Sequence, residues 1–200
     1  MAPPLQALID TVAARIIAAS EDLTTLDSAI GDADHGLNMK RGFEAVLADK
    51  ANILAKPLPE ALKALGMTLV MKVGGASGPL YGTLFMTLGK ELPAEPTLDD
   101  LARALSAAVE ALKARGKADF NNKTMLDVLG PVAVHLSSGQ ATFASVRALA
   151  AESAQATVPM KAIRGRASFL GERSIGHMDP GSRSSQIIIE SVCEVLEGTA

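Results

Sequence analysis

The chain has 200 residues, of which 48% are hydrophobic, and this is enough for one domain over residues 1–200 with a substantial core. A net charge of −3 and an aromatic content of 3% provide neither the basic surface nor the stacking side chains of nucleic-acid binding, which argues against that partner. No run of about 18 apolar residues is present, residues 1–4 do not resemble the start of a signal peptide, and the single Cys193 cannot form an internal disulfide. We therefore expect a cytoplasmic protein with no membrane partner.

Apolar residues recur at helical spacing along most of the chain, and no credible pair of strands is found. Thr97 and Asp100 resemble a capping box at the start of one helix, whereas Thr24 and Thr25 are interpreted as the entry to a loop. We predict an all-α fold, an antiparallel up-and-down barrel or bundle of about eight helices. The apolar faces of these helices cover residues 5–17, 39–47, 58–69, 80–88, 98–112, 125–136, 143–158 and 188–196.

The helix order predicts where the unusual loops lie. When successive helices run antiparallel, the first, third, fifth and seventh loops meet at one end of the bundle. These loops contain an aspartate cluster (residues 26–39), adjacent glycines (74–78), a polar stretch (117–124) and a Gly/Arg-rich stretch (165–181). We expect the functional site at this end.

The first of these loops places Asp27, Asp32 and Asp34 within eight residues. Three carboxylates this close repel one another, and a bound divalent cation relieves that repulsion. Oxygen ligands favour Mg²⁺ or Mn²⁺. Ca²⁺ in an EF-hand loop is excluded, because Gly36 and Phe43 stand where an Asp or Asn and a Glu are needed. The alternative is a solvated acidic turn that caps the following helix.

The other loops carry weaker signals. The glycine-rich loop is not a Walker A loop, but its backbone N–H groups and Ser77 are able to hold a phosphate; the alternative is a simple turn. His35 and His177 lie in motif loops and suit a phosphate role, whereas His135 lies in a helical pattern and is interpreted as structural. The histidine spacing does not indicate zinc, and no Ser-His-Asp arrangement is recognisable. Arg164, Arg166, Arg173 and Arg183 fit either a phosphate site or a solvated surface.

Three blocks, in the same order, resemble the nucleotide-binding L subunit (DhaL) of dihydroxyacetone kinase, of the phosphotransferase-system-dependent type. They are Gly-Asp-Ala-Asp-His-Gly-Leu-Asn-Met (31–39), Gly-Gly-Ala-Ser-Gly-Pro-Leu-Tyr-Gly (74–82) and Gly-Glu-Arg-Ser-Ile-Gly-His-Met-Asp-Pro-Gly (171–181). The resemblance implies a helical barrel that holds ADP or ATP through two Mg²⁺ ions at one end. It implies metal ligands at Asp27, Asp32 and Asp34. The nucleotide contacts that it implies are His35, Gly36, Leu37, Asn38, Ala76, Ser77, Asn121, Gly130, Arg166, Asp179, Pro180 and Gly181.

One position departs from the family pattern. Asn121 and Asn122 stand where the family commonly has Gly-Asp before Lys-Thr-Met. The loss of a glycine restricts a loop, although Asn is one of the few other residues that tolerates a positive φ angle. The loss of the aspartate removes a negative charge, and substrate choice or nucleotide exchange is where we expect a difference.

The resemblance implies a phosphotransferase subunit that moves a phosphoryl group from bound ATP to dihydroxyacetone on a separate K subunit. A phosphotransferase-system M subunit then rephosphorylates the bound ADP. No protein nucleophile is expected, because phosphoryl transfer mainly requires positioning and charge neutralisation. Three alternatives stay open. They are an ATP-exchanging kinase subunit for another small ketose, a regulatory module that uses Mg–ADP and binds a transcription regulator, and a plain bundle in which Asp32→Asn is neutral or stabilising.

Overall fold

The computed structural model describes residues 4–198, and every regular element in that part of the chain is helical. The predicted all-α fold is confirmed. Residues 1–3, which entered the argument against a signal peptide, lie outside the described residues. The elements are α1 (Leu5–Ala18), α2 (Ser20–Ile30), α3 (His35–Ala48), α4 (Lys50–Leu54), α5 (Leu58–Lys72), α6 (Ser77–Glu91), α7 (Leu98–Gly116), α8 (Leu126–Ser137), α9 (Phe143–Ala156), the 3₁₀ segment η1 (Arg166–Ser174) and α10 (Pro180–Glu197).

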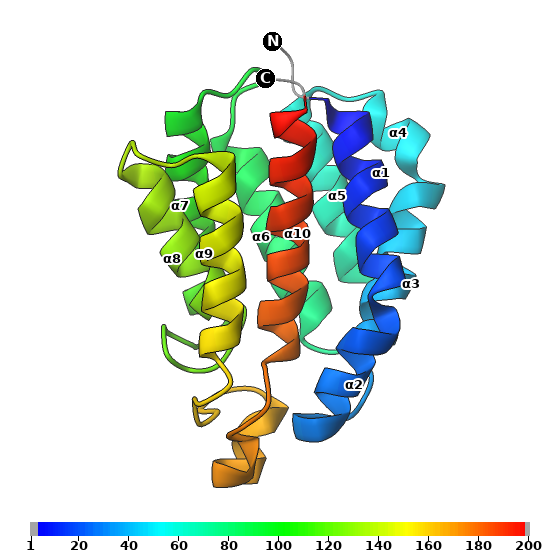
Figure 1. Ribbon diagram of the computed structural model, residues 1–200. Helices are drawn as coiled ribbons and strands as arrows, with labels where there is room; N and C mark the ends of the chain where they lie inside the picture. The colour runs from blue at the N-terminus through cyan, green and yellow to red at the C-terminus, as the bar shows by residue number, and fades with distance from the viewer. Residues whose placement is uncertain (1–3, 199–200) are drawn as a thin grey trace.

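The helix count agrees with the expected eight once two breaks are considered. A single residue, Ala19, separates α1 from α2, and Asp49 likewise separates α3 from α4. Each pair follows the same part of the barrel wall (Figure 1). The main difference from the prediction is α2 itself, because Thr24 and Thr25 belong to this helix and do not begin a loop.

The helices form a closed ring. Neighbouring helices pack in the order α1, α3, α5, α6, α7, α8, α9 and α10, and α10 then packs against α1. This closure brings the last helix beside the first, as Figure 1 shows for the red and blue ribbons. An up-and-down barrel of this kind has two ends with different loops, and the functional question becomes which end carries the chemistry.

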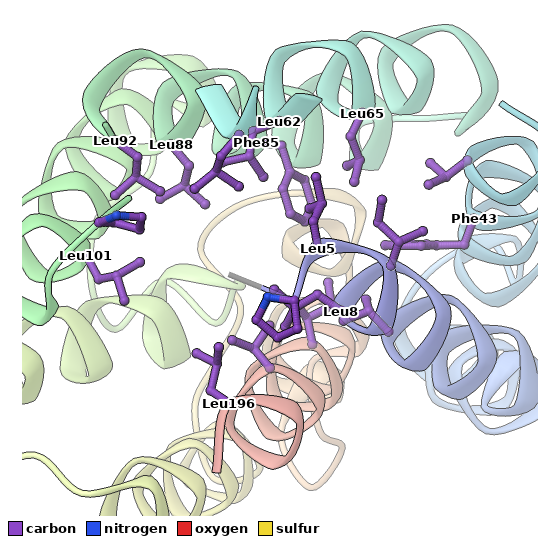
Figure 2. A pocket seen from close by; sticks show the side chains of 18 residues that line it. Leu5, Leu8, Phe43, Leu62, Leu65, Phe85, Leu88, Leu92, Leu101 and Leu196 are labelled. Carbon is purple, nitrogen blue, oxygen red and sulfur yellow. The ribbon is translucent and has the colours of Figure 1, made fainter. Parts of the chain in front are cut away.

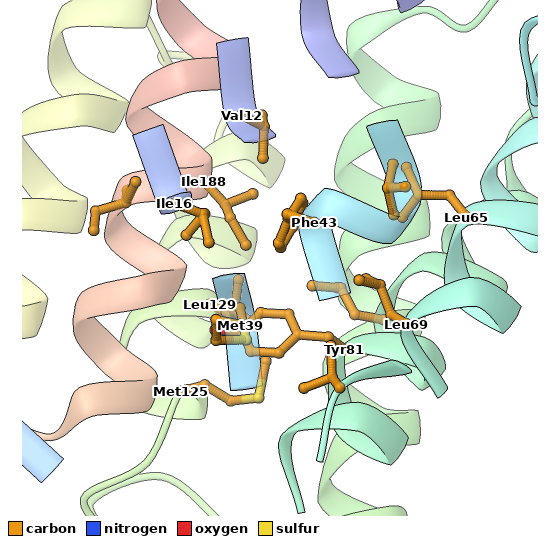
Figure 3. Packing of buried hydrophobic residues seen from close by; sticks show 14 of the residues in the cluster. Val12, Ile16, Met39, Phe43, Leu65, Leu69, Tyr81, Met125, Leu129 and Ile188 are labelled. Carbon is orange, nitrogen blue, oxygen red and sulfur yellow. The ribbon is translucent and has the colours of Figure 1, made fainter. Parts of the chain in front are cut away.

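The core fills the middle of the ring. Met39, Phe43, Tyr81, Leu129 and Ile188 come from the four helices α3, α6, α8 and α10, and they point toward one another (Figure 3). All are at most 7% exposed. Cys193 is also buried and packs with Val128 and Val132 as a small core residue.

An apolar cavity of about 360 Å³ lies between this core and the end where α1 begins and α10 ends. Leu5, Leu8, Phe43, Leu65 and Phe85 are among the side chains around it, and every lining residue is apolar (Figure 2). The described lining of this cavity therefore offers no charged or polar side chain. None of the described helices is long and apolar enough to cross a membrane.

Candidate metal and nucleotide site

The opposite end contains a second cavity of about 180 Å³, and all four loops singled out in the sequence contribute to it. The predicted convergence of these loops is therefore confirmed. Ten predicted site residues line this cavity: Asp27, Asp32, Asp34, His35, Ala76, Ser77, Arg166, Asp179, Pro180 and Gly181. The charged and polar side chains in its lining distinguish it from the apolar cavity at the other end.

Asp27, Asp32 and Asp34 have carboxylate oxygens that all lie within 4.8 Å of one another. Asp27 is on the last turn of α2, and its Oδ2 accepts hydrogen bonds from the backbone N–H groups of Asp34 (2.8 Å) and His35 (3.1 Å). A Cβ atom on Gly31 would lie 2.0 Å from Asp27 Oδ1, so only glycine lets the chain turn this tightly around the carboxylate. The cluster offers hard oxygen donors in one place, which fits Mg²⁺.

Arg166 supplies positive charge at the same point. Its Nε lies 3.0 Å from Asp32 Oδ2, and the two side chains are 69% and 35% exposed. An ion pair this open to water contributes little to stability. Both groups are therefore free to exchange this contact for a ligand in the cavity.

Three helices begin at the cavity wall, namely α3, α6 and α10. The N-terminus of a helix presents unpaired N–H groups and a partial positive charge, which favours a bound anion. The cluster of carboxylates and these three helix ends together provide separate places for a cation and for phosphate oxygens.

His35 connects the three helix starts. Its Nδ1 lies 3.0 Å from Ser77 Oγ on α6, and its Nε2 lies 2.9 Å from Ser184 Oγ on α10. Burial lowers the pKa of His35, although the nearby Asp27 and Asp34 act in the opposite direction. The neutral imidazole therefore fixes the relative positions of the helices. Tyr81 extends this network, because its hydroxyl lies 2.7 Å from Ser184 Oγ.

Asp179 caps α10 at the cavity. Its Oδ2 accepts a hydrogen bond of 2.7 Å from the backbone N–H of Ser182, and its own N–H donates to Thr157 Oγ1 at 3.1 Å. Burial raises the pKa of Asp179 to about 7. This carboxyl group is thus held as part of the wall and not as a fourth exposed charge.

Five predicted nucleotide contacts lie outside the lining of this cavity, and their roles stay predictions: Gly36, Leu37, Asn38, Asn121 and Gly130. Gly36 lets α3 approach α2, since a Cβ there would lie 2.0 Å from the Ser20 carbonyl oxygen. At Gly130 a Cβ would lie 2.2 Å from the Phe120 ring.

The other three are near the rim of this end. Leu37 is 59% exposed. Asn38 Oδ1 accepts a hydrogen bond of 2.6 Å from Arg41 Nη2, beside the glycines of the 74–78 loop. Asn121 has φ = 61°, so this position does require the left-handed conformation for which Asn is suited.

Sequence reasoning did not select several residues that line the cavity. Lys123, Thr124 and Met125 come from the loop before α8, and Arg164 precedes Arg166. The only signal for the first three was their place in the Lys-Thr-Met block. A buried lysine is unusual, and Lys123 is only 1% exposed.

A closed helical barrel with carboxylates, helix N-termini and an arginine at one end defines an all-α protein suited to hold a metal-bound anionic ligand. The DAK2 domain matches residues 29–194, and the chain belongs to this family. The ADP-binding subunit DhaL of the PEP-dependent dihydroxyacetone kinase of Escherichia coli is 44% identical over 180 residues, which cover 86% of each chain. The corresponding subunit of the PTS-dependent kinase of Lactococcus lactis is 41% identical over 174 residues, covering 87% of each.

Solved structures agree on the fold. The dihydroxyacetone kinase of C. freundii superimposes with a TM-score of 0.79 at 22% identity, covering 97% of this chain and 35% of that one. The same kinase in complex with AMP-PNP and Mg²⁺ gives a TM-score of 0.77 at 23% identity, with 34% of that chain covered.

Proposed function

We propose that this chain is the nucleotide-binding subunit of a dihydroxyacetone kinase and acts as a single domain over residues 1–200. The observation that carries the proposal is the convergence of Asp27, Asp32 and Asp34 on a cavity that three helix N-termini also face. Relatives of similar length, more than 40% identical, are named ADP-binding subunits of such kinases. The bound ligand is ADP or ATP with Mg²⁺, and two ions are proposed.

In this proposal the chain acts by positioning. Asp27, Asp32 and Asp34 hold Mg²⁺, which neutralises charge on the phosphate oxygens when it is bound. The N-termini of α3, α6 and α10 hold the phosphate groups, and Arg166 moves from Asp32 to a phosphate oxygen. His35 keeps the three helix starts in place. No side chain needs to act as a nucleophile.

The sugar acceptor is held by a separate K subunit, so the nucleotide end of the barrel has to face that subunit. Exposed apolar side chains around this end support such a contact: Phe169 is 88% exposed, Ile163 57% and Ile175 44%. The M subunit of the phosphotransferase system has to reach the same phosphate. We therefore expect the two partners to use this end in turn, in the cytoplasm, and a transcription regulator would have to compete for it.

The test is to purify the protein through extensive desalting with Mg²⁺ present, denature it, and identify the released nucleotide by chromatography. About one ADP per chain, absent from Asp32→Ala, supports the proposed site and a permanently bound cofactor. If no nucleotide is retained, Mg–ATP is titrated. Binding would then favour an ATP-exchanging kinase subunit, and the absence of binding to either nucleotide would refute the proposal.

Addition of the K and M subunits distinguishes catalysis from regulation. With phosphoenolpyruvate, the general phosphotransferase proteins and dihydroxyacetone, we expect sugar phosphate to form only when both partners are present. Retention of ADP without any sugar phosphate would favour the regulatory module.

A further inference from the structure

Lys123 is a buried charged residue that the proposed function does not use. It lies in the loop between α7 and α8, and its Nζ donates to carbonyl oxygens at 2.6–3.4 Å. The five acceptors are the backbone carbonyls of Thr157, Val158, Met160, Ser174 and His177. Among residues 4–198, no carboxylate lies within ion-pair distance of this ammonium group.

The five carbonyls come from the two ends of one segment. Residues 157–160 follow α9 and residues 174–177 precede α10, so the ammonium group joins the beginning and the end of the intervening chain. Two further contacts close the same loop, the hydrogen bond from Gly176 N–H to the Val158 carbonyl (2.8 Å) and that from Ala162 N–H to Ser174 Oγ (2.9 Å). Lys123 Nζ is the point where both ends meet.

The segment between these ends has few other attachments to the barrel. Its described buried apolar contacts are the small cluster of Ile30, Ala162 and Ala167, with Leu170 packed against it. The N–H of Ile163 also donates to the Asn122 carbonyl, next to Lys123. With so few apolar contacts, a loop of this length opens easily unless a specific group holds it.

This segment carries Arg164 and Arg166 to the cavity, where Arg166 pairs with Asp32. The backbone of Lys123 has φ = 62°, and the residues that follow it, Thr124 and Met125, line the same cavity. Lys123 thus links the part of the cavity wall next to α8 to the segment between α9 and α10.

We propose that Lys123 is a positioning residue that holds the 158–177 segment closed, so that Arg166 reaches the phosphate groups of the bound nucleotide. An ammonium group suits this task because it carries several donors and a charge that the carbonyl dipoles stabilise without water. Burial lowers the pKa of Lys123, while Asp179 acts in the opposite direction. The proposal rests on the proposed function for its effect on nucleotide, but not for its effect on the segment.

The test uses Lys123→Gly in the full chain, because glycine keeps the left-handed backbone and removes only the side chain. Lys117→Gly is the matched control, since Lys117 also has a positive φ angle (48°) and its side chain is exposed. Hydrogen exchange at the amides of Ala162, Ile163 and Gly176 measures how easily the 158–177 segment opens. The rate of ADP release measures how firmly the nucleotide is held, and far-UV circular dichroism measures the helical content of the barrel.

We expect Lys123→Gly to speed both amide exchange and ADP release by about tenfold, which corresponds to about 1.4 kcal/mol. Helical content and the Lys117→Gly control should stay at wild-type values. Unchanged exchange, or faster exchange with unchanged ADP release, would overturn the proposal. Loss of helical content would also overturn it, because Lys123 would then stabilise the whole barrel and not one segment.

A double variant with Arg166→Ala tests the route of action. If Lys123 acts through Arg166, then Arg166→Ala should speed ADP release in the wild-type background but change it by less than twofold in Lys123→Gly. If the two substitutions instead multiply their separate effects on the rate of ADP release, this route of action is contradicted. If the wild-type chain binds no nucleotide, the proposed function fails, and the exchange of the three amides still decides whether Lys123 holds the segment.

Discussion

At the scale of single residues, Asp27 and Asp32 carry the same charge but have different structural roles. Asp27 is 7% exposed and accepts two backbone N–H groups, whereas Asp32 is more open and pairs with Arg166. We expect Asp27→Ala to lower the free energy of unfolding by about 1–2 kcal/mol, because two donors lose their acceptor. Asp32→Ala should change it by less than about 1 kcal/mol.

Both variants should lose ADP, since each removes a proposed metal ligand. Thermal unfolding in EDTA, followed by the desalting assay, separates the two effects. Equal melting temperatures for Asp27→Ala and Asp32→Ala would contradict the distinct role of Asp27. Retained ADP in either variant would remove that residue from the metal site.

Asn121 is the position at which the sequence predicted a departure from the pattern of the resembled family. It adopts φ = 61°, in the left-handed region, and its N–H donates to the Asp127 carboxylate. We expect Asn121→Ala to cost about 1 kcal/mol, since alanine is strained in the left-handed region. Asn121→Gly should stay within about 0.5 kcal/mol, because relief of strain is offset by a more flexible unfolded chain. Urea unfolding midpoints measure both, and an Asn121→Ala variant as stable as Asn121→Gly would contradict the argument.

The raised pKa of Asp179 predicts that the stability of the protein depends on pH. Its pKa is raised by burial to about 7, so the folded protein binds a proton that the unfolded chain releases near pH 4. The stability from this proton is fully present below about pH 4 and is lost as the pH rises through 7. Asp179→Asn keeps an oxygen for the N–H of Ser182 but cannot ionise. Its melting temperature relative to wild type should therefore rise by a few degrees between pH 5.5 and 8.

This comparison uses the difference between the two proteins because other groups titrate in the same range. The lowered pKa of His35 has the opposite effect, because its contribution to the free energy of unfolding decreases as the pH falls. That effect is common to both proteins and cancels. A constant difference in melting temperature from pH 5.5 to 8 would show that Asp179 is ionised throughout.

At the scale of elements, apolar periodicity predicted the long helices well, but it missed α2, whose formation depends on packing against a neighbouring helix. Residues 20–30 contain two threonines and three acidic residues, a composition with little helical preference, yet they form α2 because α3 packs closely against them at Gly36. As a result Asp27 belongs to a helix and is more rigid than a loop residue. By contrast, local signals were sufficient at α7, where the predicted capping box of Thr97 and Asp100 is present.

The cap of α7 gives an element-scale prediction. Thr97 Oγ1 accepts from the backbone N–H of Asp100, and Asp100 Oδ2 accepts from the backbone N–H of Thr97. Thr97→Ala should cost about 1 kcal/mol and lower the melting temperature by about 2–4 °C. Thr97→Ser retains the hydroxyl and serves as the control. A Thr97→Ala variant with the melting temperature of wild type would mean that the cap does not stabilise the helix in this context.

At the scale of the whole molecule, chain order alone predicted that the four loops share one end. That inference depended only on helix parity, which the split of α1–α2 and α3–α4 does not change. The cage around Lys123 was beyond sequence reasoning, because its five carbonyls lie 34–54 residues away and backbone carbonyls carry no sequence signature. The path of the 158–177 segment could therefore not be predicted from local periodicity.

The same architecture separates stability from binding, because the apolar cavity and the polar site occupy opposite ends of the barrel. Leu65 is 5% exposed and lines the apolar cavity. Leu65→Ala should cost about 2–3 kcal/mol, toward the lower end of the usual range for a buried leucine, since the side chain already borders a void. The melting temperature should fall by about 5–10 °C, while ADP retention stays at the wild-type level.

Asp32→Ala should do the reverse, with a small effect on stability and loss of ADP. Because the two residues share no partner, the free energies of unfolding in EDTA should add within about 0.5 kcal/mol in the double variant. Urea unfolding of the four proteins measures this. A coupling larger than about 1 kcal/mol, or faster ADP release from Leu65→Ala, would mean that the packing of the barrel interior is linked to the nucleotide end, and the two cavities would then have to be treated as one cooperative unit.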